Sequence, residues 1–168
     1  MNDRTPVRRA AARLNGVRSW VAGHERYLWA GVFAAVLIMQ WPMLKGAYYR
    51  AAGTPVPPTS IEWRTGLGAA LVEARRTDKQ VIVDFSADWC PPCMVMKHDV
   101  WPDPAVARVL TESYVPVLID ADRDGVVSER YGVDGIPTIL VLDHTGQVIR
   151  RGAFLSASGM IRFLTETD

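Results

Sequence analysis

The two cysteines of the chain, Cys90 and Cys93, lie three residues apart, just after a short β-branched segment at 80–86. If a buried strand turns into a helix here, Cys90 lies at the helix N-terminus, where free N–H groups stabilise a thiolate. Pro91 and Pro92 then fall in the first helical turn, where a missing N–H breaks no intrahelical hydrogen bond. The pattern therefore predicts a reactive pair of thiols at the start of a helix.

Two other uses of paired cysteines fit the sequence less well. A structural disulfide usually closes a longer loop, because the entropic gain grows with loop length. A zinc site would need two more ligands, and only His24, His98 and His144 are available beside the cysteines. His24 precedes a long apolar segment, so both other histidines would be required. We therefore expect a redox-active disulfide, with no metal and no separate cofactor.

The residues after position 60 read as one compact domain, 61–168, in which helices and strands alternate. The predicted helices are 66–78, 90–100, 104–111, 124–131 and a last one that ends near 165 and is capped by Ser156 or Ser158. The predicted strands are 80–86, 114–120, 138–143 and 147–150. Strand–helix–strand units imply parallel pairs, and the hairpin at 138–150 adds antiparallel ones. We expect an α/β fold with a mixed central sheet and helices on both faces.

Two segments then resemble the signatures of the thioredoxin superfamily. Residues 80–97 resemble its active-site segment, and Gly135-Ile136-Pro137-Thr138 resembles its second signature, in which the proline is cis and faces the cysteine pair. Residues 87–90 and 101–104 also resemble segments of the C-terminal thioredoxin domain of DsbD-type thiol:disulfide interchange proteins. Two signatures about 45 residues apart are more specific than a lone CxxC. The resemblance covers residues 61–165 and implies a thioredoxin fold.

The resemblance also implies roles for individual residues. Cys90 would be the exposed nucleophile, and Cys93 would be the buried thiol that resolves the mixed disulfide. Trp89 would shape the rim of the site, and the backbone of Ile136 and Pro137 would face an extended substrate. The expected substrate-binding residues are Trp89, Pro91, Pro92, Ile136 and Pro137.

Asp84 occupies the position of the family's buried acid below the cysteine pair. Desolvation there should raise the pKa of the carboxyl group and let it accept a proton from Cys93. The alternative is a strand-end acid that is exposed to solvent. Because Asp84 stands within the apolar run 81–85, we expect it to be buried.

The sequence constrains the direction of thiol–disulfide exchange, reduction or oxidation of the substrate, less than it constrains the type of reaction. Pro91-Pro92 stands where ordinary thioredoxin has Gly-Pro, and Met94 stands where lysine is common, which leaves the redox potential and the partner surface open. Two prolines remove N–H donors that could stabilise the Cys90 thiolate, which favours a protein-disulfide reductase. The alternatives are a disulfide oxidant or isomerase, and a thioredoxin-fold chaperone or assembly factor without turnover.

An uncharged apolar segment at 27–44 predicts a transmembrane anchor of about 27 Å, close to the thickness of the hydrocarbon core. Six arginines precede it, in a basic tail at 1–26, and should hold the N-terminus in the cytoplasm. A cleaved signal peptide and a buried core helix are the alternatives. Residues 45–60, proline-rich towards their end, are predicted to be an extended tether.

This topology predicts a single-pass protein of the bacterial inner membrane with its catalytic domain in the periplasm. The expected partners are oxidised exported proteins, including apocytochromes c, and a transmembrane thiol electron donor. The net charge of +1 gives no indication of nucleic-acid binding.

Overall fold

A computed structural model describes residues 24–166, and its internal contacts divide the chain into two units that meet between Trp41 and Pro42. In the first unit the described residues form one helix, His24–Met39, whose large apolar side chains are exposed. Among residues 24–166 no single helix is both long and apolar enough to cross a membrane. The helix His24–Met39 and the following helix Trp41–Ala51 meet the length and composition test only when taken together. Most of the predicted basic tail, residues 1–23, lies outside the described residues.

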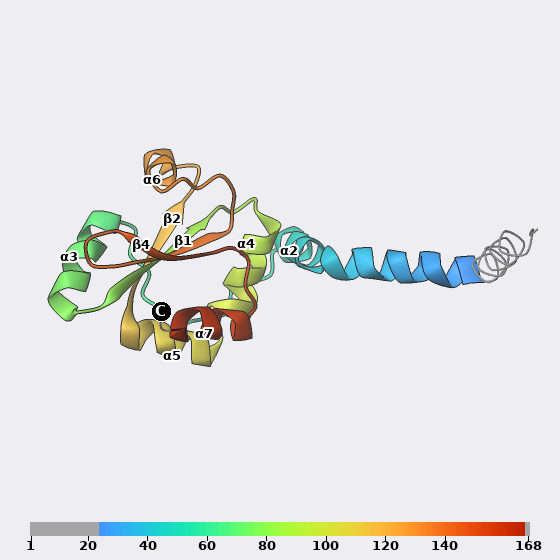
Figure 1. The fold of residues 1–168 in the computed structure, drawn as a ribbon, viewed down its shortest axis with the longest axis horizontal. Coiled ribbons are helices and arrows are strands. Elements are labelled where there is room, and N and C mark those ends of the chain that lie inside the picture. Colours follow the sequence, from blue (N-terminus) through green and yellow to red (C-terminus); the bar gives the residue numbers. More distant parts are fainter. Residues whose placement is uncertain (1–23, 167–168) are drawn as a thin grey trace, which may run out of the picture. The chain divides into compact units, whose positions relative to one another are not determined.

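The second unit, from Pro42 onward, contains the α/β domain (Figure 1). Its strands are β1 (Gln80–Ser86), β2 (Tyr114–Asp120), β3 (Thr138–Leu142) and β4 (Val148–Gly152). Its helices are α2 (Trp41–Ala51), α3 (Leu67–Thr77), α4 (Pro91–Val95), α5 (Pro104–Ser113), α6 (Gly125–Arg130) and α7 (Ala157–Thr165), with a π-helical segment η1 (Met96–Val100) after α4.

The four strands form one mixed sheet in the order β2-β1-β3-β4. β1 pairs in parallel with β2 and antiparallel with β3, and β3 pairs antiparallel with β4. β1 is therefore central, and it is buried along nearly its whole length because both faces of the sheet are covered. This position explains why its sequence is a continuous β-branched run and not an alternating one.

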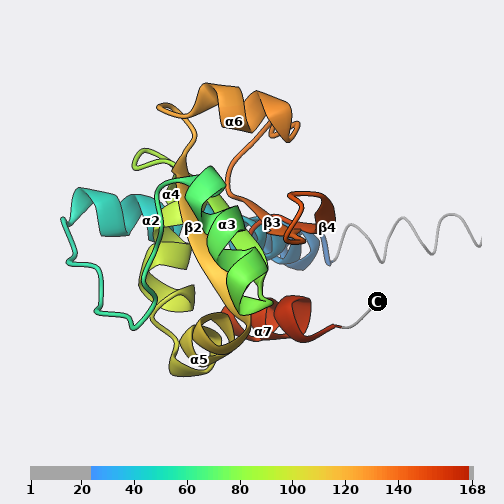
Figure 2. The same ribbon diagram turned by 90° about the vertical axis from the view of Figure 1, so that its left-hand side faces the viewer.

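Helices cover both faces of the sheet, as the sequence predicts (Figure 2). One face packs against η1, α5 and α7, around Ile82, Ile139 and Leu110. The other face packs against α3 and α6, around Phe85, Val117 and Leu140. The mixed sheet and two helical layers confirm the predicted thioredoxin architecture.

The helical segment α2 corrects the predicted tether at 45–60. Residues 45–51 belong to this helix, and only the residues after them lack regular structure. Pro42 falls in its first turn, where proline is tolerated, and Lys45 and Tyr49 both bond to Asp99. Because these contacts join residues about fifty positions apart, they are not visible in the local composition. The compact unit starts at Pro42, well ahead of the predicted boundary at residue 61.

Candidate functional site

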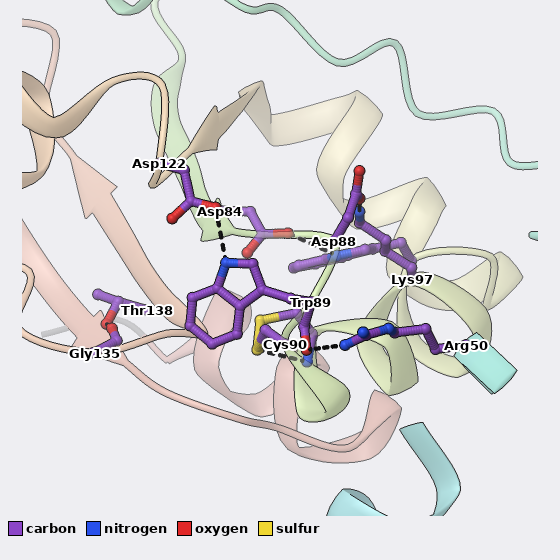
Figure 3. The surroundings of a disulfide bond; sticks show 11 residues. Arg50, Asp84, Asp88, Trp89, Cys90, Lys97, Asp122, Gly135 and Thr138 are labelled. Carbon is purple, nitrogen blue, oxygen red and sulfur yellow. Dashed lines mark hydrogen bonds and ion pairs between the residues drawn. A yellow bond between two sulfur atoms is a disulfide. The ribbon is translucent and has the colours of Figure 1, made fainter. Parts of the chain in front are cut away.

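The cysteine pair lies where β1 ends and α4 begins (Figure 3). Cys90 is the N-cap of α4 with an extended backbone (φ −83°, ψ 110°), and prolines fill the first two helical positions. Proline restricts the preceding residue to an extended conformation, so Pro91 itself favours a helix that starts after Cys90. The Cys93 N–H donates to Cys90 Sγ over 3.3 Å. The two cysteines form a disulfide, and their Cα atoms are 5.3 Å apart.

The active-site helix changes its hydrogen-bond pattern after Val95. Residues Met96–Val100 form the π-helical segment η1, which ends where the Trp101 N–H donates to the carbonyl oxygen of Met96 over 3.0 Å. π-Helical segments are rare and are often found at functional sites. Here the segment brings the buried side chain of Trp101 to a buried acid in the surroundings of the disulfide.

That acid is Asp84, which is buried in the central strand as predicted. The indole N–H of Trp101 donates to Asp84 Oδ2 over 3.0 Å, and Oδ1 has no hydrogen-bond partner within the described part of the chain. Burial raises the pKa of Asp84 to about 7, although the Trp101 hydrogen bond and the positive charge of Lys97 both oppose the rise. The carboxyl group can therefore gain or lose a proton near neutral pH.

The rim of the site is formed by Trp89 and a polar border. The Trp89 side chain is 54% exposed, and its indole N–H donates to Asp122 Oδ2 over 2.7 Å. Lys97 forms an ion pair with Asp88 at 2.7 Å, which holds the pKa of that carboxyl group below its usual range. The hydrogen bond to Asp122 holds the Trp89 ring in place, so that the ring presents an apolar face to solvent at the rim.

The second signature segment lies in the surroundings of the disulfide, where Figure 3 shows Gly135 and Thr138. The Ile136–Pro137 bond between them is cis, as the resemblance implies. The Thr138 hydroxyl donates to the Gly135 carbonyl oxygen over 2.6 Å. Pro137 is buried and Ile136 is half-buried, so only part of this segment is accessible.

Cys90 is not the exposed nucleophile that the resemblance implies. Its exposed fraction is 2%, almost as low as the 1% of Cys93. Helix α2 contacts both neighbours of Cys90, because Arg50 Nη1 donates to the Trp89 carbonyl oxygen over 3.1 Å and the buried Gly46 meets the backbone of Pro91. The prediction of an exposed Cys90 is therefore wrong, and the packing of α2 against both neighbours of Cys90 is a contact that the sequence alone does not indicate.

Comparison with known proteins agrees with this geometry. A Thioredoxin-like family model matches residues 62–144. The thiol:disulfide interchange protein DsbD of Escherichia coli O157:H7 is 29% identical over 140 residues, which is 80% of this chain and 24% of DsbD. This is a thioredoxin-superfamily protein that resembles DsbD.

Solved structures of the superfamily have the same fold. A thioredoxin from Thermus thermophilus aligns with a TM-score of 0.57 and 26% identity, over 63% of this chain and 85% of its own. A putative disulphide-isomerase from Bacteroides thetaiotaomicron aligns with a TM-score of 0.56 and 28% identity, over 67% of this chain and 98% of its own. The matched region is 24% of the length of DsbD, so the chain spans about a quarter of the DsbD proteins that it matches.

Several residues of the site were not identified from the sequence. Trp101 enters the sequence argument only as part of a similar segment, and the predicted anchor (27–44) and tether (45–60) divide the residues of α2 between them. Asp122 carries no signal of its own, because many acids follow strands. No group of three or more His, Cys, Asp or Glu side chains within residues 24–166 is arranged to hold a metal ion.

Proposed function

We propose that this chain is a thiol–disulfide oxidoreductase that reduces disulfides of other proteins through Cys90 and Cys93. The observation that carries the proposal is the Cys90–Cys93 disulfide at the first turn of α4, in a domain whose central strand carries a buried acid of raised pKa. Similarity to thiol:disulfide interchange proteins supports it. No other pair of cysteines competes for the role, since the chain has only these two.

The proposed reaction begins with reduced protein. The Cys90 thiolate attacks one sulfur of a client disulfide, forms a mixed disulfide and releases the other client sulfur as a thiolate. Asp84 takes the proton of the Cys93 thiol, and the Cys93 thiolate then attacks Cys90 Sγ. This step closes the Cys90–Cys93 disulfide and releases the second client thiolate. The client gains two electrons, and a thiol donor must return two electrons to the protein.

Hydrogen bonding at Cys90 favours reduction over oxidation. Pro91 and Pro92 have no N–H, and the bond described to Cys90 Sγ comes from the Cys93 N–H. A thiolate with few donors is only modestly stabilised, in contrast to the strongly stabilised thiolate of an oxidant such as DsbA. A thiolate that is only modestly stabilised is a poor leaving group, which favours the disulfide form of this protein.

Isomerase or oxidase activity is the second candidate, favoured by the likeness to a putative disulphide-isomerase at 28% identity. Two reactions distinguish these functions. In the first, the reduced form of this protein is mixed with a disulfide-bonded test protein such as insulin. In the second, the oxidised form of this protein is mixed with a test protein whose cysteines are reduced. We expect the first reaction to run at least about tenfold faster than the second, with Cys90→Ser inactive in both. Faster oxidation would favour the alternative, and a Cys90→Ser variant that lacks both reactions but still complements a deletion strain would indicate a chaperone.

We further propose that residues 27–44 anchor the protein in the bacterial inner membrane with the domain in the periplasm. The apolar length, the preceding arginines and the likeness to DsbD support this placement. Outside the cytoplasm the electrons would come from a transmembrane thiol donor, and the clients would be exported proteins such as apocytochromes c.

The anchor proposal predicts a membrane-bound product with a periplasmic C-terminus. A phosphatase reporter that folds only in oxidising compartments, fused after Asp168, should be active, and a reporter that requires the cytoplasm should not. Changing the five arginines of residues 1–23 to Gln should reduce this bias. A soluble product shortened by about 50 residues would contradict the anchor.

A further inference from the structure

Helix α2 contacts the loop that carries Cys90, and Figure 3 shows its residue Arg50 reaching the backbone of Trp89. Arg50 bonds to the carbonyl oxygen of Trp89, immediately before Cys90. A Cβ atom added to the buried Gly46 would overlap the carbonyl oxygen of Pro91, immediately after Cys90. The helix therefore contacts the backbone on both sides of the nucleophile.

The docked position of α2 is held by side chains of η1. Lys45 Nζ forms an ion pair with Asp99 Oδ2 at 2.6 Å, and the Tyr49 hydroxyl donates to Asp99 Oδ1 over 2.8 Å. The Tyr49 ring also stacks on the imidazole of His98, with centroids 4.2 Å apart. The anchoring contacts thus fall one helical turn apart on α2 and on two adjacent residues of η1.

A covered Cys90 cannot carry out disulfide exchange. An incoming thiolate must reach Cys90 Sγ to form the new bond and expel Cys93, and a client disulfide must reach the same atom in the reverse half of the cycle. With an exposed fraction of 2%, Cys90 offers almost no surface to either reactant. Because α2 packs against the backbone on both sides of Cys90, we infer that a docked α2 and an attacking partner would compete for the same place.

The side-chain contacts that hold α2 against η1 can break at a low cost in free energy. Lys45, Tyr49 and Asp99 are half-buried, and ion pairs in contact with water contribute little net free energy. The residues that follow α2, up to the domain core, lack helical or strand hydrogen bonds. Segments with few buried apolar contacts open at low free-energy cost.

We propose that α2 is a lid that closes over the Cys90–Cys93 pair, so that the pair exchanges with other thiols only when α2 leaves the Trp89–Pro91 loop. The proposal rests on the proposed function for its biological meaning, since the lid would control which partners gain access to the nucleophile. Its physical content, the accessibility of Cys90 Sγ, is independent of the direction of exchange and of the client.

The test is the rate at which dithiothreitol reduces the disulfide of the oxidised full-length protein. Gly46→Ala keeps α2 helical, because alanine is the better helix former, but forces it away from Pro91. Gly68→Ala is the matched control, because Gly68 lies in α3 with open space around it. We expect Gly46→Ala to react about tenfold faster than the wild type, with Gly68→Ala unchanged.

A second variant keeps the test independent of packing at Gly46. Asp99→Asn weakens both the Lys45 ion pair and the Tyr49 hydrogen bond without touching the loop of Cys90, and should accelerate reduction several-fold. Thermal unfolding of each variant shows whether the domain itself remains folded. Wild-type reduction rates in both folded variants would overturn the lid, even if the protein proves to be a reductase. A fast Gly46→Ala variant without reductase activity would support the lid and contradict the proposed function.

Discussion

Replacing Asp84 by Asn should stabilise the folded protein above pH 7, by roughly 2 kcal/mol. Burial raises the pKa of Asp84 from 3.8 to about 7 in the folded protein. Between these values the folded state holds a proton that the unfolded state has already lost. The free energy of unfolding therefore falls as the pH rises from about 4 to about 7, by about 4 kcal/mol in total. Asn removes this loss, but its amide NH₂, left unpartnered where Oδ1 was, costs part of the gain.

Denaturant unfolding at several pH values checks this result. The wild type should lose stability between pH 4 and 7, whereas Asp84→Asn should show a flatter profile. Asp134→Asn, which changes an exposed carboxyl group, should keep the wild-type slope. If Asp84→Asn has the same slope as the wild type, the carboxyl group is not the buried acid of this site. The variant should also release reduced client more slowly near neutral pH, because Cys93 loses its proton acceptor.

The Cys93→Ala variant should accumulate stable mixed disulfides with client proteins. Cys90 can still attack a client disulfide, but no resolving thiol remains to displace the reduced client. Most of the reduced variant should become trapped when an oxidised client is in excess. The matched variant Cys90→Ala should trap little, because Cys93 lies inside the first turn of α4, whereas Cys90 is the N-cap residue whose neighbours the proposed lid uncovers when it opens.

Non-reducing gels, followed by mass spectrometry of the adduct, identify the trapped sulfur. Equal trapping by the two variants would show that the assignment of the nucleophile is wrong. Combining Cys93→Ala with Gly46→Ala should speed the appearance of the adduct without changing its final amount, since α2 affects access and not chemistry.

Much of the domain could be predicted from local sequence. The strands at 80–86 and 114–120 agree with β1 and β2 because continuous β-branched runs are typical of strands covered on both faces. The helix start after Cys90 follows from two prolines that cannot lie later in a helix. Burial of Asp84 follows from its position inside such a run.

The features of the structure that could not be predicted depend on contacts between residues far apart in the sequence. No local pattern indicates that the helix ahead of the domain docks on Asp99 and His98, about fifty residues away. The π-helical segment η1 likewise has no signature that distinguishes it from an α-helix. Because neither η1 nor the docking of α2 can be predicted from local sequence, the bond between Trp101 and Asp84 and the burial of Cys90 could not be predicted either.

Equilibrium of the Cys90–Cys93 pair with a glutathione buffer tests the central claim most directly. The fraction of disulfide at each ratio of reduced to oxidised glutathione gives the reduction potential of the pair. A reductase with a modestly stabilised Cys90 thiolate should have a potential near the roughly −270 mV of thioredoxin. A value near the roughly −120 mV of DsbA would contradict the proposed direction and identify the protein as an oxidant.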